Sequence, residues 1–303
     1  MNDCTIQLAA LDLDGTLLDR TSRITPRTLD ALAAAIRRGV VVLPATGRGL
    51  SALPRVVAAI PGVRYALTSN GAAVWDLGDD PLAAVRSRYG QPGPEPVAEP
   101  VCLYRRTLPA ETARAVYALL EQYEGELNFF ADGRTLKTPA GLAWSKARMA
   151  RLLSTEAKQA DDGRFTVLPD LHPYFEAHAG EIEKFCMFFD SPELAREVLP
   201  RLAAIPGVEA TQGSPDNVEA TAAGVNKGSA LLALAGQLGI PQAQVLAVGD
   251  SENDRKMLEA AGVAAVMANG MPSIQSLADI VSQRDCNHDG VAELFERLGL
   301  TGR

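Results

Sequence analysis

Two carboxylates, Asp12 and Asp14, follow a short apolar run and are separated by one residue. The run, residues 6–11, has the length and composition of a buried strand, and Gly15 marks a turn directly after the pair. Because side chains alternate along a strand, we expect both carboxylates on one face. Like charges this close are unfavourable unless a cation or a shared proton offsets them. The pair therefore predicts a metal-assisted site, and the alternative is an Asp-Gly surface turn.

Three further polar features follow apolar runs or begin helical patterns. They are Thr46-Gly47-Arg48, Lys227 and the segment 249–254, Gly-Asp-Ser-Glu-Asn-Asp. Taken singly, each has an ordinary explanation: a strand-to-helix loop, a solvated surface charge, and a turn with a helix cap. Taken together and in order, they supply a hydroxyl, an ammonium and grouped carboxylates. Their ordered co-occurrence, rather than any one of them, supports a functional interpretation.

Alternating strand and helix patterns position these residues at both ends of the chain. Thr25-Pro26 predicts a helix start, since a hydroxyl cap precedes a proline at the first helical position. Asn226 is a second predicted cap. The alternation predicts the α/β class, with a parallel sheet that binds its ligand beyond the carboxyl ends of the strands. The remaining elements expected here are strands at 40–43, 65–68, 244–248, 263–267 and 280–282 and helices at about 50–59, 226–238, 252–261 and 291–298.

The alternation breaks in the middle of the chain. Residues 76–100 are rich in Gly, Pro and Asp and are expected to form an irregular connection. Beyond them, short turns such as Ala131-Asp132-Gly133 join neighbouring strands, which is typical of hairpins. Glu183 and Lys184 lead into an apolar strand; we expect them to face solvent, with the inner face of this module as the alternative. The pattern predicts an inserted α+β module with strands at 101–104, 126–130, 134–137, 165–168, 184–189 and 208–212 and helices at about 110–123, 144–158 and 192–204.

The ordered polar features resemble the four motifs of the haloacid dehalogenase superfamily of phosphohydrolases. The matches are Asp12-Leu13-Asp14-Gly15-Thr16 for DxDGT, Thr46 for the hydroxyl residue after a strand, Lys227 for the lysine at a helix start, and residues 249–254 for GDxxND. Ser69-Asn70-Gly71-Ala72, residues 224–228 and the tail Asp289-Gly290-Val291 resemble the Cof-type branch. That branch has a large cap between the second and third motifs. The resemblance implies a Rossmann-like parallel-sheet core at residues 1–80 and 219–303 and an α+β cap, which sets substrate specificity, at residues 81–218.

The resemblance also implies a role for each motif residue. Asp12 would be the nucleophile and Asp14 the general acid and base. Asp12, Asp250 and the backbone carbonyl of Asp14 would hold Mg²⁺, which prefers oxygen ligands. The residues that would bind the phosphoryl group are Thr46, Gly47, Asn70 and Lys227.

Four positions have supporting or undecided roles. Asn253 and Asp254 are expected to support the metal shell and to orient Lys227. Arg48 is a candidate substrate contact, and the alternative is that it pairs with an acid. Asn269 is a second candidate substrate contact, although Met267-Ala268-Asn269-Gly270 exchanges the Ala and Gly of the branch's MGNA segment.

The composition excludes several other classes. The 303 residues are 47% hydrophobic and 22% charged, with a net charge of -8 and no basic block, so we expect neither a nucleic-acid nor a membrane partner. The four cysteines are far apart, which argues against a zinc site or a disulfide scaffold. The N-terminus lacks a signal-like core, and no apolar run approaches the ~20 residues of a membrane helix. These features predict a cytoplasmic protein and indicate no oligomeric state.

Together these features predict a Mg²⁺-dependent phosphatase that acts through an aspartyl-phosphate intermediate. Its substrate would be a small phosphorylated metabolite, such as a sugar phosphate, a nucleotide or a phosphorylated cofactor. A cap of this size disfavours folded proteins as substrates. Two alternatives stay open: a sugar phosphomutase of the same superfamily, and a non-catalytic protein that binds a phosphorylated ligand.

Overall fold

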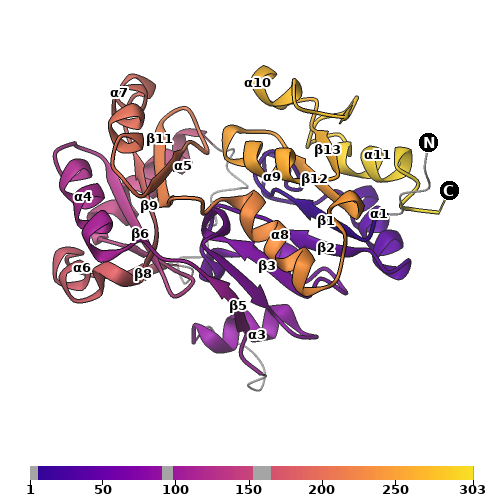
Figure 1. Cartoon of the computed structure of the whole chain (residues 1–303), viewed down its shortest axis with the longest axis horizontal. Helices are drawn as coiled ribbons and strands as arrows, with labels where there is room; N and C mark the ends of the chain where they lie inside the picture. The colour runs from indigo at the N-terminus through magenta and orange to yellow at the C-terminus, as the bar shows by residue number, and fades with distance from the viewer. Residues whose placement is uncertain (1–5, 91–97, 153–164, 303) are drawn as a thin grey trace.

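The computed structural model describes residues 6–90, 98–152 and 165–302, and side chains throughout these ranges except for 149–152. The chain forms two parts that lie side by side (Figure 1). One contains both ends of the chain, and the other contains the middle of the sequence. The predictions for residues 91–97 and for the end of the 144–158 helix fall outside the described residues.

The part that contains the two chain ends is built on a parallel sheet. Five strands described in it pair in the order β14-β13-β12-β1-β2, and all of their pairings are parallel. Helices cover both faces, with α1 packed beside α11 and α8 beside α9 (Figure 1). The strands are β1 (Leu8–Leu11), β2 (Val41–Pro44), β12 (Val245–Gly249), β13 (Val263–Val266) and β14 (Ile280–Val281), and the helices are α1 (Pro26–Arg37), α8 (Lys227–Gln237), α9 (Arg255–Ala260), α10 (Pro272–Gln275) and α11 (Gly290–Arg297).

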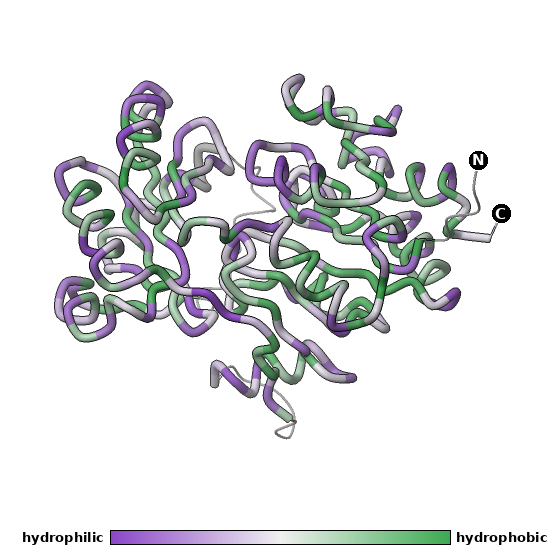
Figure 2. Tube along the Cα trace, viewed as in Figure 1, coloured by the Kyte–Doolittle hydropathy of each residue, from purple (hydrophilic) through white to green (hydrophobic). Residues whose placement is uncertain are grey.

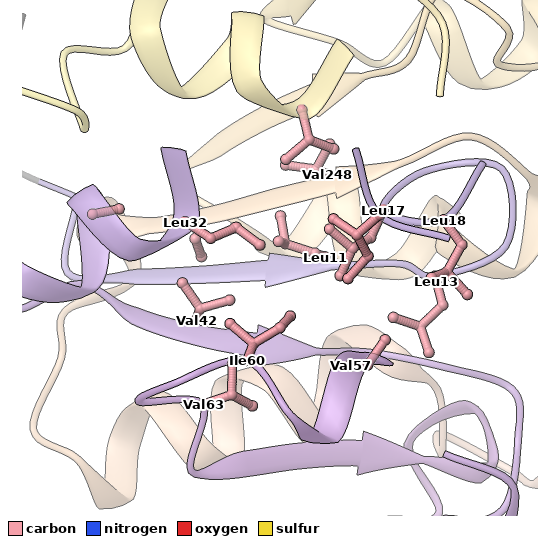
Figure 3. Close-up of a cluster of buried hydrophobic side chains, with 14 of the residues drawn as sticks. Leu11, Leu13, Leu17, Leu18, Leu32, Val42, Val57, Ile60, Val63 and Val248 are labelled. Atoms are coloured by element: carbon pink, nitrogen blue, oxygen red, sulfur yellow. The ribbon is translucent and has the colours of Figure 1, made fainter. Parts of the chain in front are cut away.

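Alternation along β1 explains why both faces of this sheet are covered. Leu8 and Ala10 belong to the buried cluster that includes α8, whereas Ala9 and Leu11 belong to the cluster that includes α1 and α11. Figure 3 shows part of the second cluster, with Leu11 near Leu32 of α1. Hydrophobic residues concentrate along the strands of this sheet (Figure 2). The predicted Rossmann-like core is confirmed.

Capping residues set the two helix starts that the sequence identifies. The Thr25 side chain accepts a hydrogen bond from the backbone N–H of Thr28 at the start of α1. Asn226 and Ser229 form a reciprocal capping box at the start of α8. Since α8 begins at Lys227, the cap also determines where this lysine enters the fold. Both predicted caps are confirmed.

A small antiparallel sheet extends the core beyond β2. It contains β3 (Tyr65–Thr68), β4 (Ala73–Asp76) and β5 (Val101–Arg105), and a parallel bridge between Ala45 and Leu67 joins it to the end of β2. The predicted irregular connection is wrong in part, because α3 (Pro81–Arg88) forms there. Asp80 caps this helix and Pro81 begins it, a local signal that the surrounding Gly and Pro residues obscured.

The inserted part is an α+β module, as predicted. Its sheet has the order β10-β11-β9-β6-β7-β8 among the described strands. Three helices, α4, α6 and α7, pack on one face around a buried cluster that includes Phe129, Phe185 and Val218. The strands are β6 (Glu126–Ala131), β7 (Arg134–Lys137), β8 (Phe165–Val167), β9 (Ile182–Phe188), β10 (Val208–Thr211) and β11 (Asn217–Ala222), and the helices are α4 (Ala110–Leu120), α5 (Pro139–Leu152), α6 (His172–His178) and α7 (Pro192–Ala203).

Strand pairing bears on the boundaries of the cap. β5, which we expected to be the first cap strand, pairs with β4 of the core. β11 pairs with β9 of the cap from Asn217 to Ala220, so most of β11 belongs to the cap sheet. We therefore propose that the cap spans about residues 106–222 rather than 81–218. Two predicted helices are also shorter than expected. Residues 50–59 form η1 (Leu50–Ala52) and α2 (Arg55–Ala58), separated at Pro54, and residues 252–261 form η7 (Glu252–Asp254) followed by α9.

Within the described residues, no helix combines the length and apolar character needed to cross a membrane.

Candidate active site

The carboxylate of Asp12 and the ammonium of Lys227 meet at the carboxyl end of the parallel sheet. Asp12 directly follows β1 and its backbone N–H donates to the carbonyl of Val248 on β12. The Nζ atom of Lys227 lies 2.5 Å from Oδ1 of Asp12 and 2.7 Å from Oδ1 of Asp254. All three side chains are buried. Residues 12, 227 and 254 are thus brought into one charged cluster.

Burial and charge shift the pKa values in this cluster. Burial raises the pKa of Asp12 well above its ordinary value, and the Asp254 carboxylate adds to this, while Lys227 opposes it. Burial alone would lower the pKa of Lys227, but Asp12 and Asp254 raise it above its ordinary value. Burial, with Asp254, raises the pKa of Asp250 to about 7, and the hydrogen bond from Thr16 opposes that rise. These shifts reflect three carboxyl groups gathered around one ammonium group at this buried site.

The surplus of buried carboxylates fits a divalent cation. Oxygen atoms of Asp12, Asp250 and Asp254 lie within 4.8 Å of one another. Both carboxylate oxygens of Asp254 already accept hydrogen bonds. Its Oδ1 accepts from Lys227, and its Oδ2 accepts from the backbone N–H groups of Asp250 and Ser251. Asp12 and Asp250 are therefore the candidate ligands, and Asp254 orients the lysine. Oxygen donors of this kind suit a hard divalent ion.

Asp14 occupies a different environment from Asp12. Its side chain is 58% exposed, against 7% for Asp12. The expectation of a shared strand face is wrong, because β1 ends at Leu11 and strand alternation does not extend to residues 12–14. Arg48 pairs with Asp14 through two hydrogen bonds, of 2.9 Å to Oδ2 and 2.6 Å to Oδ1. Of the two alternatives for Arg48, the structure therefore shows the one in which it pairs with an acid.

Thr46 and Gly47 form the loop after β2. The backbone N–H of Thr46 donates to the carbonyl of Leu67, so the hydroxyl is the donor of Thr46 that is left for a phosphoryl group. The hydroxyl of Thr46 accepts from the backbone N–H of Arg48 at 3.1 Å, and such a hydroxyl still has its own hydrogen to donate. The carbonyl of Gly47 accepts a hydrogen bond of 2.5 Å from Lys184 of the cap. The loop is therefore held by both parts of the molecule.

Asn70 adopts a left-handed backbone conformation, with φ of 55°, at the end of β3. Its Nδ2 donates to Glu219 of the cap at 2.7 Å, and its contact with a phosphoryl group stays a prediction. Its Oδ1 is buried without a hydrogen-bond partner among the described residues. Asn70 thus links the core to the cap and retains one unsatisfied acceptor.

The other two asparagines among the predicted site residues, Asn253 and Asn269, form hydrogen bonds within and between loops. Oδ1 of Asn253 accepts from the hydroxyl of Ser251 at 2.9 Å. Asn269 donates to the carbonyl of Gly15 at 2.8 Å and accepts from the backbone N–H of Cys286 at 3.0 Å. Asn269 therefore braces the loop that carries Asp12 and Asp14, and we propose this positioning role for it in place of a substrate contact.

Comparisons with known proteins agree with this geometry. The family model for haloacid dehalogenase-like hydrolases matches residues 9–86 and 98–295. The chain belongs to the haloacid dehalogenase-like hydrolases. It is therefore an enzyme, and its relatives identify it as a phosphoric monoester hydrolase.

Named relatives of this hydrolase span almost its full length. A 5-amino-6-(5-phospho-D-ribitylamino)uracil phosphatase of Bacillus subtilis is 25% identical over 96% of this chain and 95% of its own. An HMP-PP phosphatase of Klebsiella pneumoniae is 28% identical over 95% of this chain and 94% of its own.

Solved structures show the same architecture. A haloacid dehalogenase-like hydrolase from B. subtilis has a TM-score of 0.78 and 26% identity, covering 97% of this chain and 100% of that one. A subclass IIB sugar phosphatase of the superfamily has a TM-score of 0.75 at 21% identity, covering 97% of this chain and 99% of that one, and this likeness concerns the fold. The predicted family and the predicted fold class, with its inserted cap, are confirmed.

Two charged cap residues reach the loops of the candidate site, although we expected them to face solvent. Glu183 is fully buried and accepts from the hydroxyl of Ser69 at 2.9 Å and from the backbone N–H of Gly133 at 3.1 Å. Lys184 is 1% exposed and donates to Gly47 and, at 2.7 Å, to Glu219. The default expectation of solvent exposure is wrong. The signal in the sequence that could have revealed their burial is a pair of charged residues inside an otherwise apolar strand.

Gly15 allows the first catalytic loop to pass close to the candidate metal ligand. Its φ is +91°, and a Cβ atom added to it would lie 2.6 Å from Oδ2 of Asp250. We expect Gly15→Ala to lower the free energy of unfolding by about 1–2 kcal/mol, the cost of a left-handed backbone for an L-residue. We also expect it to lower kcat/KM by at least about tenfold, because Asp250 must move. Thermal unfolding and steady-state kinetics measure the two effects.

Gly39→Ala is the matched control for this prediction. Gly39 has a similar φ of +88°, but a Cβ atom there would meet nothing within 4 Å. This variant should lose comparable stability while keeping its activity. Equal activity in the two variants would show that crowding of Asp250 by residue 15 has no consequence.

Proposed function

We propose that this enzyme is a Mg²⁺-dependent phosphatase that hydrolyses a small phosphorylated metabolite through an aspartyl-phosphate intermediate. The observation that carries the proposal is the buried carboxylate of Asp12, held 2.5 Å from Lys227 with Asp250 beside it. The position at the carboxyl end of β1 is where ligands bind in open parallel sheets. Lys227 keeps the Asp12 carboxylate oriented and offsets negative charge where a phosphoryl group would arrive.

Each residue has a defined part in the proposed reaction. A carboxylate oxygen of Asp12 attacks phosphorus, and the bond from phosphorus to the leaving oxygen breaks. Asp14 first leaves its two hydrogen bonds from Arg48, which favour the ionised carboxylate. In its protonated form it then donates a proton to that oxygen, and it later accepts one from the water that hydrolyses the aspartyl phosphate. Thr46 donates its hydroxyl hydrogen to a phosphoryl oxygen. Mg²⁺ held by Asp12, Asp250 and the backbone carbonyl of Asp14 would neutralise charge on the transferring group.

The small size of the substrate follows from how the cap meets the core. Lys184 and Glu219 of the cap bond directly to the loops that carry Gly47 and Asn70. A cap held this close to the core disfavours a folded protein as substrate. The B. subtilis and K. pneumoniae relatives, which bear the names of small phosphorylated compounds, support the same substrate class.

Metal removal tests this proposal. Purified enzyme with Mg²⁺ should release inorganic phosphate from members of a panel of sugar phosphates, nucleotides and phosphorylated cofactors. EDTA should lower the rate roughly 100-fold or more, and excess Mg²⁺ should restore it, because a bound cation supplies several kcal/mol of charge stabilisation. EDTA presaturated with Mg²⁺ is the control.

Three outcomes would contradict the proposal. An unchanged rate in the presence of EDTA would show that Asp250 is not the ligand of a required metal ion. An isomerised sugar phosphate without phosphate release would identify a mutase. Absence of turnover on the whole panel would favour a protein that only binds phosphorylated ligands.

A further inference from the structure

The turn after β3 has an uncommon backbone conformation. Ser69 and Asn70, in the short helix η2 (Ser69–Gly71), have φ values of 52° and 55°. Within the described ranges, this is the only place where two consecutive residues other than glycine both have a positive φ. An L-residue adopts such a conformation at a cost, so contacts from other segments must hold it. We call Ser69-Asn70 the left-handed turn.

The left-handed turn holds the loop that follows β2. The backbone N–H of Ser69 donates to the carbonyl of Arg48 at 2.9 Å. The backbone N–H of Asn70 donates to the carbonyl of Thr46 at 3.1 Å. Because these N–H groups belong to the turn itself, their direction depends on its left-handed backbone. The turn therefore determines where the loop places the Thr46 hydroxyl, the donor proposed for the phosphoryl group.

Two carboxylates of the cap bind the side chains of the left-handed turn. Oγ of Ser69 donates to Oε2 of Glu183 at 2.9 Å. Nδ2 of Asn70 donates to Oε2 of Glu219 at 2.7 Å. All four side chains are buried, so water does not compete for these hydrogen bonds. The contacts that hold the turn thus come from the other part of the molecule.

A β-bulge directs Glu183 at the core. Phe130 of β6 pairs with Lys184 of β9, but the next residue, Ala131, pairs with Ile182, so Glu183 is an extra residue between the two pairs. A bulge of this kind gives a side chain a new direction. It explains why Glu183 and Lys184 both reach the core, although successive side chains of a regular strand point to opposite faces.

Glu183 is itself held in place by the atoms around its second oxygen. Its Oε1 accepts from the backbone N–H of Gly133 at 3.1 Å and lies 3.4 Å from Nε of Arg105. Burial raises the pKa of Glu183, and Arg105, Ser69 and Gly133 oppose that rise. These contacts on Oε1 leave Oε2 directed at Ser69.

We propose that Glu183 is a positioning residue for the reaction, because from the cap it holds Ser69 in the left-handed conformation and thereby fixes the loop of Thr46. The phosphate-binding loop is then complete only while the cap is docked on the core. In this role Glu183 acts on the phosphoryl site alone, so its effect is the same for every leaving group. This inference rests on the proposed phosphatase function.

Two substitutions of Ser69 separate its hydrogen bond from its backbone conformation. Ser69→Ala removes the hydroxyl and keeps the cost of the left-handed backbone, whereas the glycine of Ser69→Gly adopts this conformation freely. The readouts are kcat/KM for 4-nitrophenyl phosphate and for a sugar phosphate, and the Ki of inorganic phosphate as an inhibitor.

The two variants should differ in both readouts. We expect Ser69→Ala to lower kcat/KM and to raise the Ki of phosphate about five- to tenfold, the loss of one buried hydrogen bond to a charged group. Ser69→Gly should stay within about threefold of the wild type, because its turn keeps its shape without the carboxylate. Equal losses in the two variants, or unchanged kinetics in Ser69→Ala, would overturn the inference.

Glu183→Met tests whether the carboxylate acts through Ser69, since methionine keeps the length of the side chain and removes the acceptor. We expect kcat/KM to fall about tenfold for both substrates. In the Ser69→Gly background the same substitution should cost less than about threefold, because the turn no longer depends on Glu183. Equal losses in the two backgrounds would overturn the role. A loss confined to the sugar phosphate would also overturn it and would show that Glu183 contacts the leaving group.

Val198→Ala is the control for cap stability. Val198 of α7 is fully buried in the hydrophobic cluster of the cap. Its truncation should lower the melting temperature of the protein while leaving kcat/KM and the Ki of phosphate within about twofold of the wild type. Kinetic losses equal to those of Glu183→Met would assign the effect to cap stability and overturn the inference. Absence of phosphate release by the wild type from every substrate would instead contradict the proposed function.

Discussion

Asp12→Asn is expected to lower kcat by about 10³-fold or more, because an amide cannot act as the nucleophile of the proposed reaction. The fold should persist. Burial and Asp254 raise the pKa of Asp12, so its ionisation at neutral pH costs stability in the folded chain. Replacing the carboxylate by an amide removes that cost, while Lys227 keeps its 2.7 Å contact with Asp254.

Two measurements on this variant separate a catalytic effect from a structural one. Phosphate release should be lost, and thermal unfolding without added metal should occur at or above the wild-type temperature. Asp30→Asn, the same substitution at an exposed position of α1, should leave both properties unchanged. Near-normal turnover by Asp12→Asn would refute the nucleophile assignment. Loss of activity together with a strongly lowered melting temperature would show that Asp12 is needed for folding instead.

The parts of the site that the sequence predicts depend on local signals. Each predicted motif residue follows a short apolar strand or begins a capped helix. Thr25 and Asn226 cap their helices as expected, and the second cap brings Lys227 to the sheet edge that carries Asp12. Parallel strands align their carboxyl ends, so the convergence of distant motifs follows from the fold class alone.

The parts that could not be predicted depend on contacts between distant segments. The pairing of β5 with β4 across α3, and the bond from Lys184 to Gly47, have no counterpart in local propensity. The sequence did not decide whether Arg48 contacts the substrate or pairs with an acid, and in the structure it pairs with Asp14. Charges within an apolar strand, such as Glu183 in β9, indicate a buried polar contact without identifying its partner.

Lys227→Met is expected to damage both stability and activity. The Lys227 side chain is fully buried and is the ammonium that contacts both Asp12 and Asp254. Without this ammonium, no positive charge offsets the repulsion among the carboxylates of Asp12, Asp254 and Asp250. Such a loss typically lowers the free energy of unfolding by about 3–5 kcal/mol. The loss of a positive charge beside the transferring phosphoryl group should lower kcat by roughly 10²–10³-fold. Lys256→Met, which removes a partly exposed lysine paired with Glu259, should change stability by less than about 1 kcal/mol.

A double-mutant cycle tests the physical cause of this instability. If the cost of Lys227→Met arises from uncompensated negative charge, then Asp12→Asn should raise stability by about 1–2 kcal/mol more in the Lys227→Met background than in the wild type, because only there is the removed carboxylate without its ammonium. Activity should stay absent in the double variant, since the nucleophile is also gone. Urea denaturation of the wild type, both single variants and the double variant measures the coupling between residues 12 and 227. An equal effect of Asp12→Asn in the two backgrounds would contradict the charge-balance explanation and would assign the effect of Lys227 to packing around its buried methylene chain.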